Sequence, residues 1–180
     1  MKTLIIYFSQ PGEVYNVGMV DIGNTEIMAK NIAEILQADG IGVDMFKIEP
    51  VKEYPREYQA VLEIAQAEMA EDARPEFKGE IPDASDYDAI FVGYPIWWGE
   101  PPYIVYSVLE KMNLDGKWMI PFNTHEGSGD AGTYHLLKEK FPQAKFRVGL
   151  AITGRSARED SSKEHIKDWL NENKLLGEIK

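Results

Sequence analysis

The sequence has no cysteine, few basic residues and no long hydrophobic run. The missing cysteine excludes disulfide bonds, thiolate metal sites and cysteine-ligated iron–sulfur clusters, and it fits a reducing compartment inside the cell. The 19 lysines and arginines stand against 30 acidic residues, which gives a formal net charge of −11. Binding to nucleic acid or to an anionic membrane is therefore not expected. The acidic surface either steers the protein towards a partner with a basic face or serves solubility alone.

The apolar stretch at residues 4–8 is too short for a signal peptide, and no small-residue cleavage site follows it. No segment approaches the roughly 20 apolar residues that a membrane-spanning helix needs. The length of 180 residues suits one hydrophobic core, so we expect a single domain over residues 1–180. The expected location is the cytoplasm.

Strand-like and helix-like segments alternate along the chain, which predicts a doubly wound α/β fold with a mostly parallel sheet. The expected strands are residues 4–8, 43–48, 89–92, 118–122 and 146–152. Polar residues alternate in the second of these strands, which indicates an edge position. Helices are expected at the apolar repeat of residues 28–36, at 58–69, at 104–112, through 136 and 137 up to Pro142, and after a capping-box pattern at 161–164.

Two adjacent tryptophans, Trp97 and Trp98, follow the apolar run 89–93, which predicts a strand buried on both faces. The loop that carries them, residues 94–102, contains three prolines and Gly99. Ligands of open α/β sheets bind beyond the carboxyl ends of the strands, and an indole there is well shaped to stack on a flat ring. We therefore expect a planar, conjugated ligand. The alternative is that both indoles fill the core beneath the next helix.

The first loop runs from Ser9 to an expected helix start at Gly-Asn-Thr-Glu, residues 23–26. Asparagine and threonine at such a position can cap the helix, and free backbone N–H groups at a helix start, with Ser9 facing them, can bind an anion. No lysine or arginine occurs in residues 3–29. We therefore expect a phosphate here to be held by N–H and hydroxyl groups alone, which excludes a Walker-type loop.

The loop after the fourth expected strand, residues 123–132, contains Gly127, Gly129 and Gly132 in a G-x-G-x-x-G pattern. This pattern does not follow the first strand, and no acidic residue stands about 20 positions later to hold a ribose. We therefore do not interpret it as a dinucleotide site. A flexible loop that offers backbone groups to the edge of a ring is the expectation.

Four motifs occur in order over essentially the whole chain. They are a strand ending in Tyr-Phe-Ser at 7–9, Gly-Asn-Thr at 23–25, Gly-Tyr-Pro-x-Trp-Trp-Gly at 93–99 and Thr-His-x-Gly-Ser-Gly at 124–129. Together they resemble the flavodoxin family, and most closely its bacterial subgroup with an insertion in the first loop. The resemblance implies a three-layer sandwich around a five-stranded parallel sheet of order 2-1-3-4-5, with non-covalently bound FMN.

The resemblance also implies three groups of FMN contacts. They are Ser9, Gln10, Asn24 and Thr25 for the phosphate; Pro95, Ile96, Trp97, Trp98 and Gly99 beside the isoalloxazine; and Thr124, His125, Glu126, Gly127 and Gly129 along its other edge. The insertion, Pro11 to Ile22, departs from the usual unbroken phosphate loop. Its Tyr15 either covers the site or packs on the surface, and Ser9-x-x-Gly12 competes as the phosphate-binding turn.

By this resemblance the protein transfers electrons to redox partner proteins, as a monomer or weak homodimer. The three loops carry acidic residues but no lysine or arginine, and such surroundings would repel an anionic reduced flavin. A low reduction potential is therefore expected. The alternative is an NAD(P)H-dependent FMN oxidoreductase of the quinone reductase type, with His125 as proton donor unless its ring is bonded to backbone. A receiver-type signalling domain is excluded, because residues 7–10 supply no carboxylates.

Overall fold

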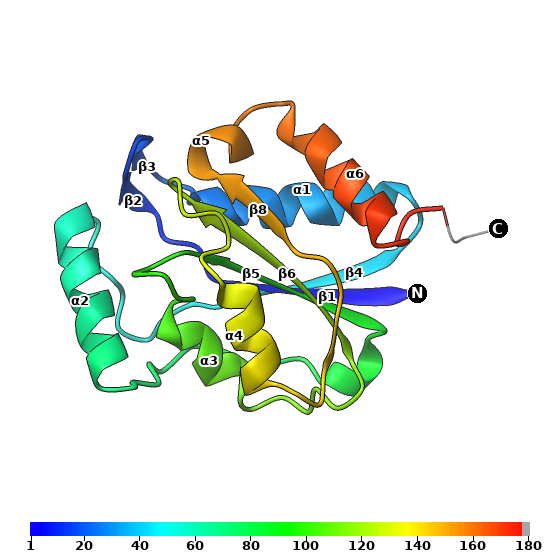
Figure 1. Ribbon diagram of the computed structural model, residues 1–180, viewed down its shortest axis with the longest axis horizontal. Helices are drawn as coiled ribbons and strands as arrows, with labels where there is room; N and C mark the ends of the chain where they lie inside the picture. The colour runs from blue at the N-terminus through cyan, green and yellow to red at the C-terminus, as the bar shows by residue number, and fades with distance from the viewer. Residues whose placement is uncertain (178–180) are drawn as a thin grey trace.

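A parallel sheet lies between layers of helices in the computed structural model, which describes residues 1–177 (Figure 1). Its strands are β1 (Lys2–Tyr7), β4 (Gly42–Lys47), β5 (Ala89–Pro95), β6 (Trp118–His125), β7 (Lys145–Phe146) and β8 (Leu150–Thr153). The order is β4-β1-β5-β6-β7, and β8 also pairs with β6. The expected α/β class is confirmed, with β4 at the edge. Taking β7 and β8 as parts of one strand gives the neighbours that the order 2-1-3-4-5 describes.

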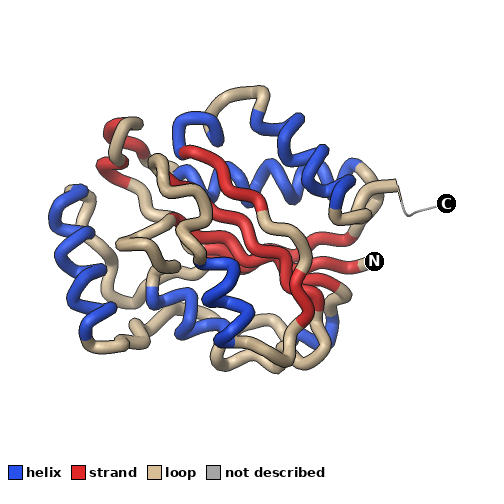
Figure 2. Tube along the Cα trace, viewed as in Figure 1, coloured by secondary structure: helices blue, strands red, loops and turns tan. Residues whose placement is uncertain are grey.

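Helices cover both faces of the sheet. On one face lie α1 (Asn24–Ala38), α5 (Gly154–Ala157) and α6 (Ser162–Glu172), and on the other α3 (Tyr103–Leu109) and α4 (Thr133–Lys140). A short 3-10 helix spans Ala84–Asp86. Figure 2 shows α2 (Tyr58–Ala70) standing apart from the other helices, beyond the ends of the strands. Helix α2 therefore lies next to the carboxyl edge of the sheet, where it can form one side of a site.

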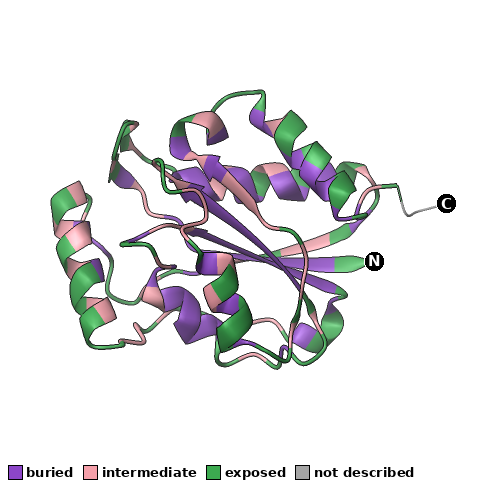
Figure 3. Cartoon of the chain, in the orientation of Figure 1, coloured by how far each residue is buried: buried purple, intermediate pink, exposed green. Residues whose placement is uncertain are grey.

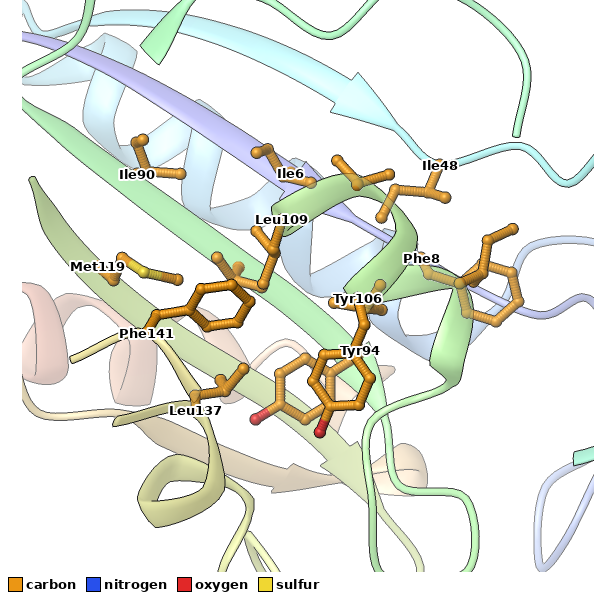
Figure 4. Close-up of a cluster of buried hydrophobic side chains, with 14 of the residues drawn as sticks. Ile6, Phe8, Ile48, Ile90, Tyr94, Tyr106, Leu109, Met119, Leu137 and Phe141 are labelled. Carbon is orange, nitrogen blue, oxygen red and sulfur yellow. The ribbon is translucent and has the colours of Figure 1, made fainter. Parts of the chain in front are cut away.

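The core consists of two apolar clusters, one on each face of the sheet. Strands β1 and β5 are buried along nearly their whole length, as Figure 3 shows, because helices cover both of their faces. The cluster beneath α3 and α4 is drawn in Figure 4, where the labelled side chains are Ile6, Phe8, Ile48, Ile90, Tyr94, Tyr106, Leu109, Met119, Leu137 and Phe141. The rigid part of the molecule is thus the layer from which the central loops emerge.

The prediction of one continuous fifth strand over 146–152 was wrong, because residues 147–149 separate β7 from β8. The backbone of Val148 bonds to side chains of the last helix region instead of to a strand: its N–H donates to Asn173 Oδ1 (3.0 Å) and its carbonyl accepts from Trp169 Nε1 (2.7 Å). A Cβ on Gly149 would lie 2.3 Å from the ring of Tyr134, so this segment is also fixed sterically.

The expected capping box at the start of α6 is also absent. Ser161 occupies the N-cap position, but its backbone is already helical, with φ −60° and ψ −19°, and its side chain makes no cap hydrogen bond. Side-chain capping needs an extended N-cap residue, so the hydroxyl is not placed to accept from the first turn. None of the helices in residues 1–177 is both long and apolar enough to span a bilayer.

The insertion in the first loop forms a hairpin that the sequence pattern does not indicate. Its strands are β2 (Gly12–Val14) and β3 (Gly18–Val20), paired antiparallel. Gly12 and Gly18 have φ values of +114° and +102°, and Asn16 in the turn has +59°, a left-handed region that glycine and asparagine tolerate. The hairpin projects from the carboxyl edge of the sheet on the same side as α2 (Figure 1).

Candidate functional site

A cavity of about 360 Å³ lies where β1, β5 and β6 end. Its lining residues come from five segments and are Gln10, Glu13, Val14, Tyr15, Asn24, Thr25, Tyr58, Val61, Leu62, Pro95, Ile96, Trp97, Trp98, Gly99, Thr124, His125, Glu126 and Ser128. Of the expected contacts, all but Ser9, Gly127 and Gly129 are in this lining. The three predicted loops therefore converge on one space, as the topology of a parallel sheet requires.

The first loop ends at α1, whose N-cap is Gly23 and has no side-chain cap hydrogen bond. The hydroxyl of Ser9 acts in its place, because its Oγ accepts from the N–H of Glu26 at 3.0 Å. The N–H groups of Asn24 and Thr25, in the first helical turn, have no partner within the helix. Ser9 is thus outside the cavity lining but holds the end of the helix that faces it.

The first and third loops are joined by a hydroxyl pair. Thr25 Oγ1 and Thr124 Oγ1 lie 2.8 Å apart, and both side chains are buried. One hydroxyl donates to the other, so the pair fixes the start of α1 against the end of β6. Gly12, the residue of the competing turn, lies in β2 and outside the cavity lining, and a Cβ there would be 2.5 Å from the carbonyl oxygen of Arg56.

The first loop contains no lysine or arginine of its own, but the fold brings one cation to it from a distant part of the chain. Arg158, just after α5, donates from Nε to Asn24 Oδ1 at 2.7 Å and from Nη2 to the carbonyl of Ile22. A search limited to the loop's own residues misses it, because it is separated from Asn24 by 134 positions. Burial lowers the pKa of Arg158. The only sequence signal was a basic residue shortly after the last expected strand, which is weak by itself.

The two tryptophans of the second loop have different environments. Trp97 is 8% exposed and packs edge-on against Phe8 and Tyr54, with ring centroids 5.3 and 5.1 Å away. Trp98 is 50% exposed, has φ +52°, and donates from Nε1 to the carbonyl of Leu62 in α2 at 2.9 Å. Trp97 is therefore mainly a core residue at the floor of the cavity, whereas Trp98 reaches across to α2.

The third loop places His125 and Glu126 in the cavity lining. The N–H of Gly127 donates to His125 Nδ1 at 3.0 Å, so in the neutral ring Nε2 carries the proton. Burial lowers the pKa of His125, and the nearby charge of Asp130 offsets only part of this change. The lowered pKa favours the neutral form of the ring. Burial raises the pKa of Glu126, and a hydrogen bond from the Gly154 backbone opposes this.

The remaining glycines of the third loop shape it without reaching the cavity. Gly127 and Gly129 have φ values of +125° and +62°. The carbonyl of Gly129 accepts from Asn123 Nδ2 at 3.0 Å, and Asn123 Oδ1 in turn accepts from the hydroxyl of Tyr134. The loop is therefore tied to the end of β6 and to α4, which holds His125 and Glu126 in place.

The wall opposite the sheet is made by the hairpin and α2, and sequence reasoning missed most of it. Its aromatic residues are Tyr15 and Tyr58, whose rings stack with centroids 5.9 Å apart and an interplanar angle of 27°. Val61 and Leu62 of α2 line the cavity as well. The repeat of apolar residues in α2 indicated a helix, but nothing in it indicated where that helix would lie.

Several bonds hold the hairpin to Arg56, just before α2, and to the first residue of that helix. The N–H of Glu13 donates to the carbonyl of Arg56 at 2.7 Å, and the Glu13 carboxylate accepts from the N–H of Tyr58 at 3.0 Å, at the start of the helix. Arg56 Nη2 donates to the carbonyl of Val20 (3.2 Å) and pairs with Asp21 (2.9 Å). We name these residues, 12–20 together with 54–62, the outer wall of the cavity.

Charge in the cavity lining is acidic. Glu13 and Glu126 line it, and no lysine or arginine among residues 1–177 does. Glu26, in the first turn of α1, lies between Lys30 and Lys47; burial would raise its pKa, but these two cations hold it below its usual range. Within the described part of the chain, no cluster of side chains has the composition of a metal site.

Comparison with known proteins adds a family and a set of similar structures. A family model described as flavodoxin matches residues 2–173. No curated protein shows significant similarity to the chain. A Bacteroides eggerthii protein described as a flavoprotein is 29% identical, with a TM-score of 0.71, over 94% of this chain and 96% of its own.

Two more distant structures share the fold. A flavoprotein from Lactobacillus acidophilus, solved in complex with FMN, is 21% identical with a TM-score of 0.68, over 93% of this chain and 97% of its own. A flavodoxin from the domain Archaea is 16% identical with a TM-score of 0.60, over 97% of this chain and 99% of its own. At these identities the likeness is evidence of the fold alone.

Proposed function

The chain belongs to the flavodoxin family, and we propose that it binds FMN and acts in low-potential electron transfer between partner proteins. The FMN complex of the similar Lactobacillus acidophilus protein supports the choice of flavin. When bound, FMN supplies the redox chemistry, and the protein supplies binding, orientation and electrostatics. The observation that carries the proposal is a cavity with a helix start at one end, aromatic rings on its walls and only acidic or neutral groups in its lining.

The chemistry of the lining fits FMN. At one end, the first-turn N–H groups of α1 and the one hydroxyl of the Thr25–Thr124 pair that does not donate within the pair offer donors to a phosphate. At the other end, Trp98 and Tyr15 offer aromatic faces for a tricyclic ring. His125 offers an N–H donor to a polar ring edge through Nε2. These residues would hold the flavin without a covalent bond.

The charge of the lining supports a low potential. Adding the second electron to a flavin produces an anion unless a proton follows, and an anion is destabilised by carboxylates in a poorly solvated cavity. Glu13 and Glu126 line the cavity without a lining cation to offset them. We therefore expect the second one-electron step to require a lower potential than it does for free FMN.

A redox titration of the FMN-loaded protein, with free FMN in the same buffer as reference, tests this proposal. A second-electron potential more negative than that of free FMN is the expected result. An equal or less negative value would contradict the low-potential carrier. If the purified protein gains no visible absorption on adding FMN, flavin binding itself is contradicted.

The second candidate is an NAD(P)H-dependent oxidoreductase, and His125 is the observation that favours it. Its ring is bonded to backbone, as the alternative reading of this residue expected, but only through Nδ1; the Nε2–H in the cavity lining could still donate a proton to a bound acceptor such as a quinone. The two candidates differ in the electron donor. Anaerobic addition of NADPH separates them: bleaching of the yellow colour within seconds favours the reductase, and persistent colour favours a carrier that needs a separate donor protein.

A further inference from the structure

The guanidinium of Arg158 differs from the other cations near the first loop. Lys30 and Lys47 both pair with Glu26, and Arg56 pairs with Asp21. Arg158 has no carboxylate within ion-pair distance among residues 1–177; its two acceptors are an amide oxygen and a backbone carbonyl. The described residues therefore supply no acidic partner for its charge, and the side chain is exposed.

Two helix ends act on this charge in opposite directions, because Arg158 is the C-cap of the short helix α5, where a cation is favoured, and also meets the start of α1. Arg158 is bonded to Asn24, the first residue of the 15-residue helix α1, where the helix dipole is already positive. A cation at a helix start is normally avoided, because it repels that dipole. Nε and one hydrogen of Nη2 are used, so the Nη1 amino group and the second Nη2 hydrogen have no acceptor in the described residues.

Arg158 also fixes the orientation of a residue that lines the cavity. Because Asn24 Oδ1 accepts from Arg158 Nε, the amide NH₂ is the part of that side chain left to donate. Gly154 makes room for this arrangement, since a Cβ there would lie 2.1 Å from Asn24 Nδ2. The side chain of Asn24 is 6% exposed and is held on both sides.

We propose that Arg158 makes the site selective for a phosphorylated flavin, FMN, over riboflavin. Arg158 is outside the cavity lining, so it acts from its position beside Asn24: it adds positive charge near the phosphate end and holds the Asn24 amide with its NH₂ as a donor. Arg158 is thus a positioning residue and a source of charge, and the isoalloxazine end of the cavity does not depend on it. The inference rests on the proposed binding of FMN and adds the residue that selects its phosphorylated form.

The test compares the dissociation constants of FMN and riboflavin for the wild type and for Arg158→Gln, by quenching of flavin fluorescence. Loss of the nearby charge and of the bond that orients the Asn24 amide should together weaken FMN binding roughly tenfold to hundredfold. Riboflavin binding should not change, because it has no phosphate. Arg158→Lys, which keeps the charge, should restore part of the preference.

Arg155→Gln is the matched control, because Arg155 lies on α5, the short helix that Arg158 follows, is exposed and forms none of the ion pairs found among residues 1–177. It should leave both constants unchanged. Thermal melting of the apo-proteins checks that Arg158→Gln folds. Raising the salt concentration should weaken FMN binding to the wild type more than to Arg158→Gln, since screening acts on the charge term.

Equal shifts for FMN and riboflavin in Arg158→Gln would show a general structural role and overturn the inference, as would no shift for either flavin. Both outcomes leave the proposed function standing, because the wild type still binds flavin. A wild type that binds neither flavin would overturn the proposed function, and the inference with it. The ratio of the two constants therefore distinguishes the two failures.

Discussion

The two walls of the cavity differ in how they are attached to the rest of the molecule. The inner wall comes from loops that leave β1, β5 and β6, and its floor residue Trp97 packs into the apolar core. The outer wall, residues 12–20 and 54–62, sends Tyr54 and Val61 into the same core, but its hairpin is held by hydrogen bonds to Arg56 and Tyr58. The inner wall is thus part of the core, whereas the hairpin half of the outer wall is attached to the core only through residues 54–62.

This difference teaches which substitutions should affect folding and which should affect only the ligand. Damage to the inner wall removes apolar contacts that the whole sheet shares, so stability and binding fall together. Damage to the outer wall leaves the sheet intact, so binding should fall with a smaller loss of stability. Four substitutions test this separation.

The largest expected effect is on stability, from Trp97→Ala. Replacing a buried tryptophan leaves a cavity beside Phe8 and Tyr54 and should lower the free energy of unfolding by about 3–5 kcal/mol. Trp98→Ala is the matched control: Trp98 is half exposed, so the loss should stay near 1 kcal/mol, while the flavin dissociation constant rises. Urea unfolding of both apo-proteins measures this, and equal losses would contradict the assignment of the two tryptophans.

Gly12→Ala should detach the hairpin from α2. A Cβ at Gly12 would lie 2.5 Å from the backbone oxygen of Arg56, and the positive φ adds strain, so we expect a loss of about 1–3 kcal/mol and weaker flavin binding. Gly18→Ala has a similar φ but meets nothing within 4 Å. The Gly18→Ala variant should therefore lose stability only because alanine is strained at this positive φ, and it should keep its flavin affinity. Calorimetric melting and flavin titration of both variants decide, and an equal loss of affinity would refute the role of the contact.

Tyr15→Ala removes an aromatic face of the outer wall that lines the cavity. The flavin dissociation constant should rise by roughly three- to tenfold, in line with about 0.5–1.5 kcal/mol for an aromatic pair. Met19→Ala is the control, because Met19 is on the same hairpin, 64% exposed and outside the lining. If the two variants bind flavin equally well, Tyr15 packs on the surface and does not cover the ligand.

The smallest effect concerns the charge of the inner wall. Glu126→Gln removes a carboxylate from the lining and should make the second-electron potential less negative by roughly 40 mV, which corresponds to about 1 kcal/mol. Burial raises the pKa of Glu126, so the shift should shrink as the pH falls and the wild-type carboxyl becomes protonated. Glu164→Gln on α6, exposed and outside the lining, is the control for redox titration. A wild-type-like potential in Glu126→Gln would contradict the electrostatic explanation.

The sheet and the inner wall could be predicted because both depend on short-range patterns. Apolar runs such as 89–93 mark strands covered on both faces, and the loops that follow them must meet at one edge. The motifs at 93–99 and 124–129 then place specific residues at that edge. The tryptophan pair shows the limit of this reasoning, because two identical neighbours divide between the core and the cavity, depending on which direction each side chain takes.

The outer wall and Arg158 could not be predicted in the same way, since both depend on contacts between distant segments. Glu13 meets Tyr58 across 45 positions, and Arg158 meets Asn24 across 134. The break in the last strand has the same origin, because Asn173 and Trp169 take the backbone groups of Val148. A local residue pattern predicts the secondary structure of each segment. Which distant residues come into contact depends on how the segments pack in the folded protein.

The attachment of the hairpin to the first turn of α2 has a consequence for hydrogen exchange. The carboxylate of Glu13 holds the N–H of Tyr58, so the hairpin and the start of that helix should open together as one small cooperative unit while the sheet stays closed. Amide exchange in the ligand-free protein would therefore be fast and correlated over residues 12–20 and the first turn of α2, and slow in β1 and β5. A ligand that contacts both walls would slow amide exchange in this unit more than elsewhere in the protein. The segment that exchanges fastest without ligand would therefore be the best reporter of ligand binding.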